Sequence, residues 1–163
     1  MTSKTYDDVA QTQNRLTASS SHLIPTTPPT AMSAQRPFIT CHVLDTTTGK
    51  PGASIAVALK LVSPSLSQTT SAPYWTAITN SDGRVPSWTS SVEINDVVSR
   101  IKQDLKAGQQ MIWSLTFDTE PYFGEGNTFW PEVELRFAAK REEEHYHVPL
   151  LLGPWSYTTY RGS

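Results

Sequence analysis

Cysteine is almost absent from this chain, in which Cys41 is the only one among 163 residues. A single thiol cannot form a disulfide within the chain or a metal site built from several cysteines. The sequence also lacks any apolar run approaching the roughly 20 residues that a membrane-spanning helix requires. We therefore expect no disulfide framework and no membrane partner, and the cysteine content fits a reducing compartment.

An excess of charge of either sign is also missing. The formal net charge is −2 and the isoelectric point is about 6.1, which gives no electrostatic reason to expect nucleic acid as a partner. Hydrophobic residues make up 37% of the chain and charged residues 17%. With a length typical of one domain, this composition favours a globular domain with some disordered sequence attached.

The first 36 residues have few large apolar side chains. From Thr17 to Gln35 the sequence is rich in Ser, Thr, Pro and Ala. Such a segment buries too little apolar surface to offset the entropy lost on ordering. We therefore predict a disordered tail over residues 1–36 and a folded domain over residues 37–163.

One pattern stands out in that tail, over residues 15–23. Arg15-Leu16 is followed by five residues and then by His22-Leu23. This spacing matches the type 2 peroxisomal targeting signal, in which an import receptor reads both pairs on one helical face. The pattern predicts a peroxisomal location, with a chance match as the alternative. Translation from Met32 would give a form without the signal, which we expect to be cytoplasmic.

From Pro37 onward, short alternating runs predict β-strands. In Phe38–Asp45, Ile39, Cys41 and Val43 share one face, and Phe38, Thr40, His42 and Leu44 share the other. No βαβ rhythm is present, so the fold class is mostly β, an antiparallel β-sandwich. The further predicted strands contain Ile55–Leu61, Tyr74–Thr79, Met111–Phe117, Glu132–Phe137, His145–Leu152 and Ser156–Arg161.

Two segments depart from this alternation. Between Val92 and Leu105, the apolar residues recur at spacings of three and four, which predicts a helix. A second, shorter helix is expected near Thr119–Gly126, where Pro121 suits a first-turn position.

The histidines offer the first candidate chemistry. His145 and His147 lie two apart in a predicted strand, so both project from one face, and His42 lies on another strand. His-x-His with a third histidine is compatible with a metal site. No cysteine pair and no His-Glu-x-x-His pattern supports that interpretation, and it stays open as the lesser alternative.

Other hydrolytic arrangements have less support. The sequence contains no Gly-x-Ser-x-Gly elbow for a serine nucleophile. Cys41 alternates onto the apolar face, which favours a buried, inert thiol. A third possibility needs no covalent step, because neutral imidazoles and one fixed cation can activate water and stabilise an anion. Arg84, directly after Asp82-Gly83, is a candidate for that cation, although a turn arginine is more commonly just exposed.

Four stretches of the chain resemble the 5-hydroxyisourate hydrolases of the transthyretin-related group, in the same order. The last stretch, from His145 to Ser163, contains His-Tyr-His-Val-Pro-Leu-Leu-Leu and ends in Tyr-Arg-Gly-Ser, and it is the most specific. Together the stretches span residues 38 to 163. The other three are Ile39–Asp45, Thr79–Arg84, and Phe117–Thr119 with Tyr122-Phe123 and Phe129–Val133.

The resemblance implies a transthyretin-like sandwich of two four-stranded sheets with a short helix. It also implies a homotetramer whose active sites lie in the channel at the interface between dimers. The family's catalytic positions fall on His42, Arg84, His147 and Ser163, with His147 rather than His145 as the second histidine. Substrate-binding positions fall on His42, Arg84, Tyr160 and Ser163.

The implied reaction is hydrolysis of 5-hydroxyisourate, without metal or cofactor, to 2-oxo-4-hydroxy-4-carboxy-5-ureidoimidazoline. In this hypothesis His42 and His147 orient and deprotonate a water, and Arg84 stabilises charge on the attacked carbonyl. Ser163 helps to hold the water or the ring, so we expect changes at the chain end to damage activity more than stability. The alternatives are a transthyretin-type carrier of a small hydrophobic ligand and a purely structural sandwich.

The chain departs from the family's pattern at a few places. Gly153 stands where serine is usual, and Asn80 replaces a common aspartate beside the Arg84 turn. The segments Ser63–Pro73 and Ser90–Lys106 are longer than usual, which puts strand boundaries there in doubt. None of the four predicted catalytic positions is altered.

Overall fold

The structure is a computed structural model that describes residues 35–65 and 73–163. These residues belong to one folded unit, Ala34–Ser163. The predicted targeting residues Arg15, Leu16, His22 and Leu23 lie outside the described residues, so the targeting hypothesis stays a prediction. Among the described residues, no helical segment has the length and hydrophobicity needed to span a bilayer.

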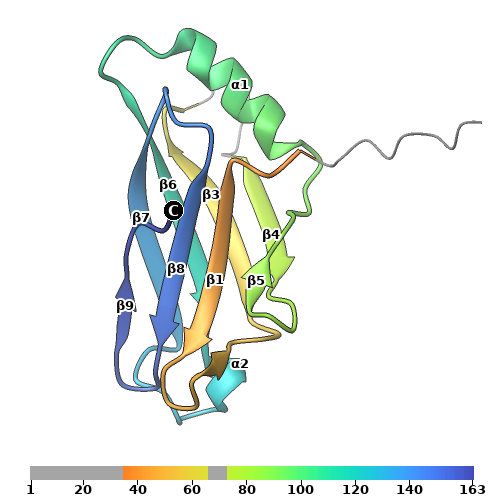
Figure 1. The fold of residues 1–163 in the computed structure, drawn as a ribbon, viewed down its shortest axis with the longest axis vertical. Coiled ribbons are helices and arrows are strands. Elements are labelled where there is room, and N and C mark those ends of the chain that lie inside the picture. Colours follow the sequence, from red (N-terminus) through yellow and green to blue (C-terminus); the bar gives the residue numbers. More distant parts are fainter. Residues whose placement is uncertain (1–34, 66–72) are drawn as a thin grey trace, which may run out of the picture. The chain divides into compact units, whose positions relative to one another are not determined.

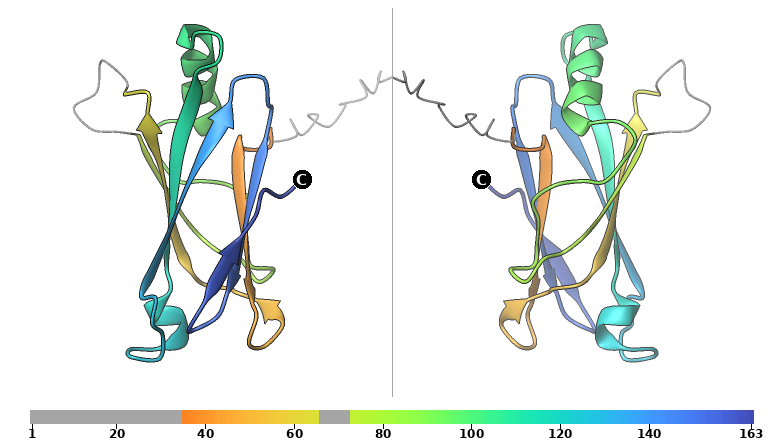
Figure 2. Two further views of the ribbon diagram at one scale, coloured as in Figure 1. Left: turned by 90° about the vertical axis from the view of Figure 1, so that its left-hand side faces the viewer. Right: turned by 90° about the vertical axis from the view of Figure 1, so that its right-hand side faces the viewer.

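Two β-sheets pack face to face, as the alternating runs predicted (Figure 2). The first sheet has the order β2-β1-β8-β9, with β5 pairing to β1 as well. The second sheet has the order β4-β3-β6-β7. The strands of the first sheet are β1 (Ile39–Asp45), β2 (Lys50–Pro51), β5 (Arg84–Val85), β8 (Tyr146–Leu152) and β9 (Tyr157–Thr159). Those of the second are β3 (Ala56–Ser63), β4 (Tyr74–Ile78), β6 (Gln110–Asp118) and β7 (Glu132–Lys140).

The sheets differ in two respects from the predicted pair of four-stranded antiparallel sheets. The first sheet contains five strands, because the two-residue strands β2 and β5 both pair with β1. In addition, β1 and β8 run parallel over seven register pairs, whereas all other strand pairs of the described residues are antiparallel. Parallel neighbours need a long connection, and here the whole second sheet intervenes between them.

The core lies between the two sheets. Ile39, Cys41 and Val43 of β1 are fully buried, which confirms the face predicted for them. On the facing sheet, Trp75 and Trp113 are buried with ring centroids 5.7 Å apart. Because successive side chains of a strand alternate between faces, burying these residues directs Thr40 and His42 to the outer face of the first sheet.

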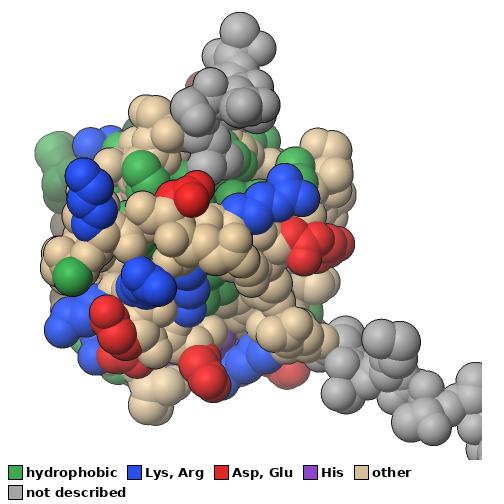
Figure 3. All heavy atoms as spheres, turned by 90° about the horizontal axis from the view of Figure 1, so that it is seen from above, with side chains coloured by type: hydrophobic (Ala, Val, Ile, Leu, Met, Phe, Trp, Pro, Cys, Tyr) green, Lys and Arg blue, Asp and Glu red, His purple; other side chains and the backbone are tan. Residues whose placement is uncertain are grey.

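Both predicted helices are present. The first, α1 (Ile94–Asp104), lies across one end of the sandwich (Figure 1) and buries Ile94, Val97, Val98 and Ile101. The side-chain oxygen of Asn95 accepts a hydrogen bond from the backbone N–H of Phe38 at 2.8 Å, which fixes the helix to the entry of β1. Seen from this end, acidic and basic side chains are interspersed (Figure 3).

The second helix, α2 (Glu120–Phe123), is a single turn with proline near its start, as predicted. It lies at the opposite end of the sandwich (Figure 1). The hydroxyl of Tyr122 donates to the carboxylate of Asp45 at 3.0 Å, and the backbone N–H of Thr47 donates to the same group at 2.7 Å. The last residue of β1 is therefore held from both sides, which fixes the strand that carries His42.

Candidate active site

Strand pairing brings three of the predicted catalytic residues onto one face. Arg84 of β5 is the register partner of His42 on β1, and His147 of β8 is the register partner of Thr40. Thr40 and His42 are two residues apart, so they share a face of β1, and register partners on neighbouring strands share that face too. His42, Arg84 and His147 therefore meet on the outer face of the first sheet.

A tight turn sets the position of Arg84. Gly83 has a φ of +70°, and a Cβ there would lie 2.4 Å from the backbone oxygen of Val43. The N–H of Val43 donates to the carbonyl of Gly83 at 2.8 Å. The side-chain oxygen of Asn80 accepts from the N–H groups of Asp82 and Arg84. An amide oxygen thus serves as acceptor where the family commonly has a carboxylate, so the departure at Asn80 leaves the turn intact.

The C-terminal run reaches the same face along β8. The pairing of Leu150 with Thr159 and the bridge between His147 and Gly162 follow one unbroken antiparallel register. The N–H of Gly162 donates to the carbonyl of His147 at 2.9 Å. A Cβ at Gly162 would lie only 2.7 Å from Cδ2 of the His147 ring, so the ring packs directly on this glycine.

The remaining predicted residues are placed by that register. Tyr160 shares the outer face with His147 and is 57% exposed. Arg161 points to the other side, where its guanidinium lies 5.3 Å from the Tyr146 ring and pairs with Glu143. Ser163 is exposed beside Gly162. The chain end lies on the outer side of the first sheet (Figure 2).

Burial and positive charge lower the pKa of both imidazoles. The His42 and His147 ring centroids are 6.4 Å apart, with the ring planes inclined by 26°. Burial lowers the pKa of His42, the charge of Arg84 lowers it further, and Asp82 opposes the shift. Burial also lowers the pKa of His147, with further contributions from Arg84, His42 and His145. Both rings therefore favour the unprotonated state, in which an imidazole nitrogen can accept a proton.

Thr40 is the residue at this site that the sequence analysis did not identify. Its hydroxyl lies 2.9 Å from Nδ1 of His147 and 3.2 Å from Nε2 of His145. The alternation did place Thr40 on the face of His42, and it placed His145 and His147 on one face of their own strand. The position of the threonine between the two rings could not be predicted, because its partners are 105 and 107 residues away in the chain.

Two alternatives from the sequence can be compared with the structure. Cys41 is fully buried, and burial raises its pKa to about 12, which confirms an inert thiol. Within residues 35–65 and 73–163, no three His, Cys, Asp or Glu side chains are grouped as a metal site would require.

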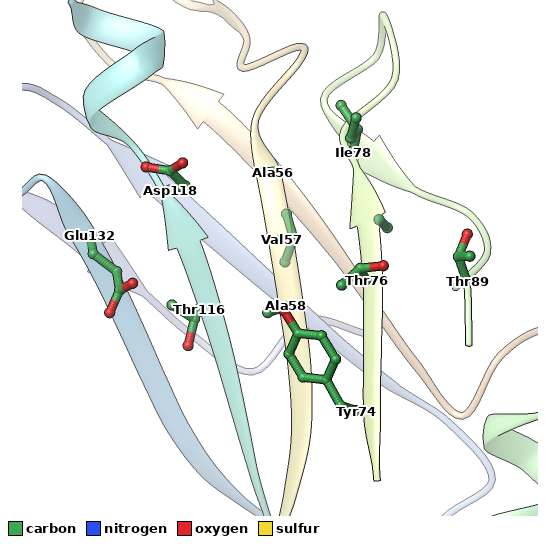
Figure 4. A pocket seen from close by; sticks show the side chains of 11 residues that line it. Ala56, Val57, Ala58, Tyr74, Thr76, Ile78, Thr89, Thr116, Asp118 and Glu132 are labelled. Atoms are coloured by element: carbon green, nitrogen blue, oxygen red, sulfur yellow. The ribbon is translucent and has the colours of Figure 1, made fainter. Parts of the chain in front are cut away.

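One concave surface of the molecule includes His147, and another lies on the second sheet, away from the histidines. A cavity of about 410 Å³ is lined by β7, β8 and the chain end, including His147, Tyr160 and Arg161. A groove of about 720 Å³ lies on the outer face of the second sheet (Figure 4). Small side chains such as Ala56 and Ala58 form its floor, and its lining includes neither histidine nor arginine. Neither surface is lined by His42 or Arg84.

The departure at Gly153 has a steric explanation. A Cβ at this position would lie 3.0 Å from the Thr46 hydroxyl and 3.4 Å from the backbone oxygen of Ser156. A serine would therefore require Thr46 to move by a few tenths of an ångström. Of the two lengthened segments, residues 90–106 contain α1, and residues 66–72 lie outside the described ranges.

Comparison with known proteins finds relatives that align with most of this chain. A 5-hydroxyisourate hydrolase of Mus musculus is 37% identical over 81% of this chain and 100% of its own length. A protein of Schizosaccharomyces pombe described as a probable 5-hydroxyisourate hydrolase is 38% identical, over 79% of this chain and 94% of its own. Another 5-hydroxyisourate hydrolase, from Deinococcus radiodurans, is 39% identical over 78% of this chain and 97% of its own.

Solved structures give the same picture of the fold. An (S)-allantoin synthase superposes with a TM-score of 0.58 and 31% identity, over 78% of this chain but only 44% of that longer chain. Transthyretin from Sparus aurata superposes with a TM-score of 0.54 and 23% identity, over 78% of this chain and 97% of its own, which supports the fold alone. The family match itself extends over residues 39–162, from β1 to the residue that contacts His147, and the chain belongs to the HIUase/Transthyretin family.

Proposed function

We propose that this chain is a hydrolase that opens the ring of 5-hydroxyisourate at its cyclic amide bond. The observation that carries the proposal is the meeting of His42, Arg84 and His147 on one face, with Gly162 packed against His147. Relatives named as 5-hydroxyisourate hydrolases align with this chain over nearly their whole lengths, which supports the same assignment.

In the proposed reaction, a neutral imidazole of the His42 and His147 pair takes a proton from water as the water oxygen bonds to the amide carbonyl carbon. Arg84 stabilises the negative charge that develops on the carbonyl oxygen. The C–N bond then breaks, and the leaving nitrogen takes up a proton while a carboxylate forms. Tyr160 and Ser163 border the substrate, and the product is 2-oxo-4-hydroxy-4-carboxy-5-ureidoimidazoline.

A carrier function is the competing proposal, because transthyretin shares this fold. A channel for a hydrophobic ligand has no need for two neutral imidazoles and an exposed guanidinium on one face. The test is an absorbance assay in which urate oxidase generates 5-hydroxyisourate in place. Added protein should accelerate its decay, in EDTA as well as without it. No acceleration would contradict the proposal, and loss in EDTA with recovery on zinc would favour a metal site.

We further propose that the active protein is a homotetramer with its sites at the interface between dimers. The site face supports this, because His42 is only half-buried, Arg84 is exposed and Tyr160 is 57% exposed. A second subunit would close this face and exclude water from it. Analytical ultracentrifugation should give a mass of four chains, and a monomer with full activity would contradict the proposal.

Import into peroxisomes is proposed from the tail pattern Arg15-Leu16 and His22-Leu23, through binding to an import receptor. A fluorescent protein fused behind residues 1–36 should enter peroxisomes, and His22→Ala should leave it diffuse. Diffuse fluorescence of the unaltered fusion would contradict the targeting proposal. A fusion that begins at Met32 is the matched control for a cytoplasmic form.

A further inference from the structure

A chain of four groups leads from the backbone to the His147 ring. The carbonyl oxygen of Pro37 lies 2.9 Å from Nδ1 of His145. Nε2 of His145 lies 3.2 Å from the hydroxyl of Thr40, and that hydroxyl lies 2.9 Å from Nδ1 of His147. Thr40 is only 8% exposed, so its hydroxyl depends on these two rings rather than on bulk water.

The direction of every hydrogen bond in this chain follows from its first member. A carbonyl oxygen can only accept, so Nδ1 of His145 carries the proton. In a neutral ring Nε2 of His145 then has a lone pair, which accepts the hydroxyl proton of Thr40. The Thr40 oxygen has donated its only proton, so it accepts from Nδ1–H of His147. Nε2 of His147 is left unprotonated.

This order of hydrogen bonds requires a neutral His145, and the surroundings of His145 favour the neutral ring. Burial lowers the pKa of His145, and the charge of Arg36 lowers it further, while the Pro37 carbonyl has the opposite effect. The charged and titratable groups that act on His147 are Arg84, His42, His145 and Arg36, and all of them lower its pKa. No acidic group is among the causes for either ring.

The hydrogen bond to Thr40 also fixes the orientation of the His147 ring. One edge of the ring, at Nδ1, meets Thr40, and Cδ2 packs against Gly162. A ring turned by half a rotation would place carbon where Nδ1 now bonds to Thr40. The hydrogen bond therefore selects the orientation in which Nδ1 meets Thr40 and Cδ2 packs against Gly162.

We propose that Thr40 and His145 are positioning residues, which hold His147 protonated at Nδ1 with Nε2 free to take a proton from water. The inference rests on the hydrolase function proposed above. Neither residue touches the reacting atoms in this scheme. Both act through the ring of His147, in the way that a hydrogen-bonded partner fixes the tautomer of a metal-bound or catalytic histidine.

Nitrogen NMR of the histidine rings in the full chain tests the assignment without any substrate. In the unaltered protein, His147 should carry its proton on Nδ1. In His145→Phe the Thr40 hydroxyl loses its other acceptor and can donate to His147, so the proton of His147 should move toward Nε2. A proton on Nε2 in the unaltered protein, or an unchanged tautomer in His145→Phe, would overturn the proposal.

Kinetics of Thr40→Val and Thr40→Ser test the consequence for the reaction. Valine keeps the shape and removes the hydroxyl, so kcat should fall about ten- to a hundredfold while KM changes much less. Serine restores a hydroxyl at the same place and should recover most of the rate. An unchanged kcat in Thr40→Val would remove the positioning role, as would a Thr40→Ser rate no better than that of valine.

The two experiments also separate this inference from the function on which it rests. In one outcome, the unaltered protein has the Nδ1 tautomer of His147 and His145→Phe reverses it, but the protein does not accelerate decay of 5-hydroxyisourate. The hydrogen-bonded chain then stands and the hydrolase proposal fails. If decay is accelerated but neither the tautomer nor kcat responds to the variants, the hydrolase proposal stands and the positioning role fails. Should Thr40→Val not fold, the NMR comparison of His145→Phe decides.

Discussion

At the scale of single residues, the outer face of β1 carries side chains with separate tasks. Thr40 contacts His145 and His147, and His42 lies opposite Arg84. On the inner face of the same strand, Cys41 and Val43 are fully buried in the core. A two-residue period thus divides one short strand between stability and chemistry.

Replacing either imidazole that faces the substrate should slow the reaction without unfolding the protein. For His42→Asn and for His147→Asn we expect at least about a tenfold slower decay of 5-hydroxyisourate, because a proton acceptor is lost from the transition state. The absorbance assay measures the rate, and ultracentrifugation checks that the assembly is unchanged. Rates equal to that of the unaltered protein would contradict the assignment of these residues.

Arg84 should determine the pH below which the enzyme loses activity. Its charge lowers the pKa of both His42 and His147, so Arg84→Gln should let both pKa values rise. Neutral imidazoles are needed for catalysis, and they protonate as the pH falls through the pKa. The acidic limb of the pH–rate profile should therefore move to higher pH in Arg84→Gln, in addition to any loss of kcat. Arg136→Gln is a matched control, because that exposed arginine pairs with Glu134 on the other sheet.

The positions of single site residues could be predicted only in part from the sequence. Alternation alone assigned Thr40 and His42 to one face and Cys41 to the other, and the complete burial of Cys41 confirms the inner face. Phe38 was assigned to the face of His42, and this was wrong, because its side chain is buried in the core. The resemblance selected His147 over His145, and this choice stays a prediction. The contact of Thr40 with both histidines was not predictable, because it depends on a strand register that joins residues over a hundred positions apart.

At the scale of elements, the two-residue strand β5 depends on the turn before it. Gly83 has a positive φ and no room for a Cβ beside the Val43 oxygen. Gly49 has a nearly equal φ of +68°, but nothing lies within 4 Å of a Cβ there. A side chain at Gly49 would meet backbone strain alone, whereas a side chain at Gly83 would meet backbone strain and a steric clash.

Alanine at these glycines should give clearly different losses. Gly49→Ala should cost about 1 kcal/mol of unfolding free energy, which is the penalty of the left-handed conformation. Gly83→Ala should cost about 3 kcal/mol or more, because the displaced Val43 oxygen belongs to the β1 backbone. Urea unfolding measures both values. Equal losses would show that the turn relaxes freely and does not fix Arg84.

Element boundaries were predicted well where the pattern is long and poorly where the strands are short. The spacing of apolar residues indicated a helix at residues 92–105, and α1 spans Ile94–Asp104. No two-residue strand carries enough alternation to be recognised, so β2 and β5 were missed as strands. The parallel pairing of β1 with β8 was missed because hydrophobic alternation is the same in both orientations.

At the scale of the whole molecule, stability should depend on pH in two separate windows. His42, His145 and His147 have pKa values lowered in the folded state, so the unfolded chain binds more protons below about pH 6.5. Burial alone would raise the pKa of Asp45, but hydrogen bonds from Thr47, Thr48 and Tyr122 outweigh it and lower the pKa. Both effects stabilise the fold at higher pH and are lost as the pH falls.

Urea unfolding at a series of pH values tests this expectation. The unfolding free energy should begin to decrease below about pH 6.5, as the unfolded histidines take up protons first. It should decrease again when the pH falls below the ordinary range of an aspartate, about 3.9. Tyr122→Phe removes one donor to Asp45 and should weaken only the second decrease. A profile that is flat between pH 7 and pH 5 would contradict the lowered histidine pKa values.

The order in which the chain is synthesised gives the parallel pairing of β1 and β8 a further consequence. His42 leaves the ribosome early, but its long neighbour β8 begins only at Tyr146, and the contact of His147 with Gly162 comes later still. Until then, β1 can pair only with the two-residue strands β2 and β5. The second sheet can be complete at residue 140, well before the face that carries the histidines exists. A nascent chain can therefore complete the second sheet before the face that carries His42 and His147 is assembled.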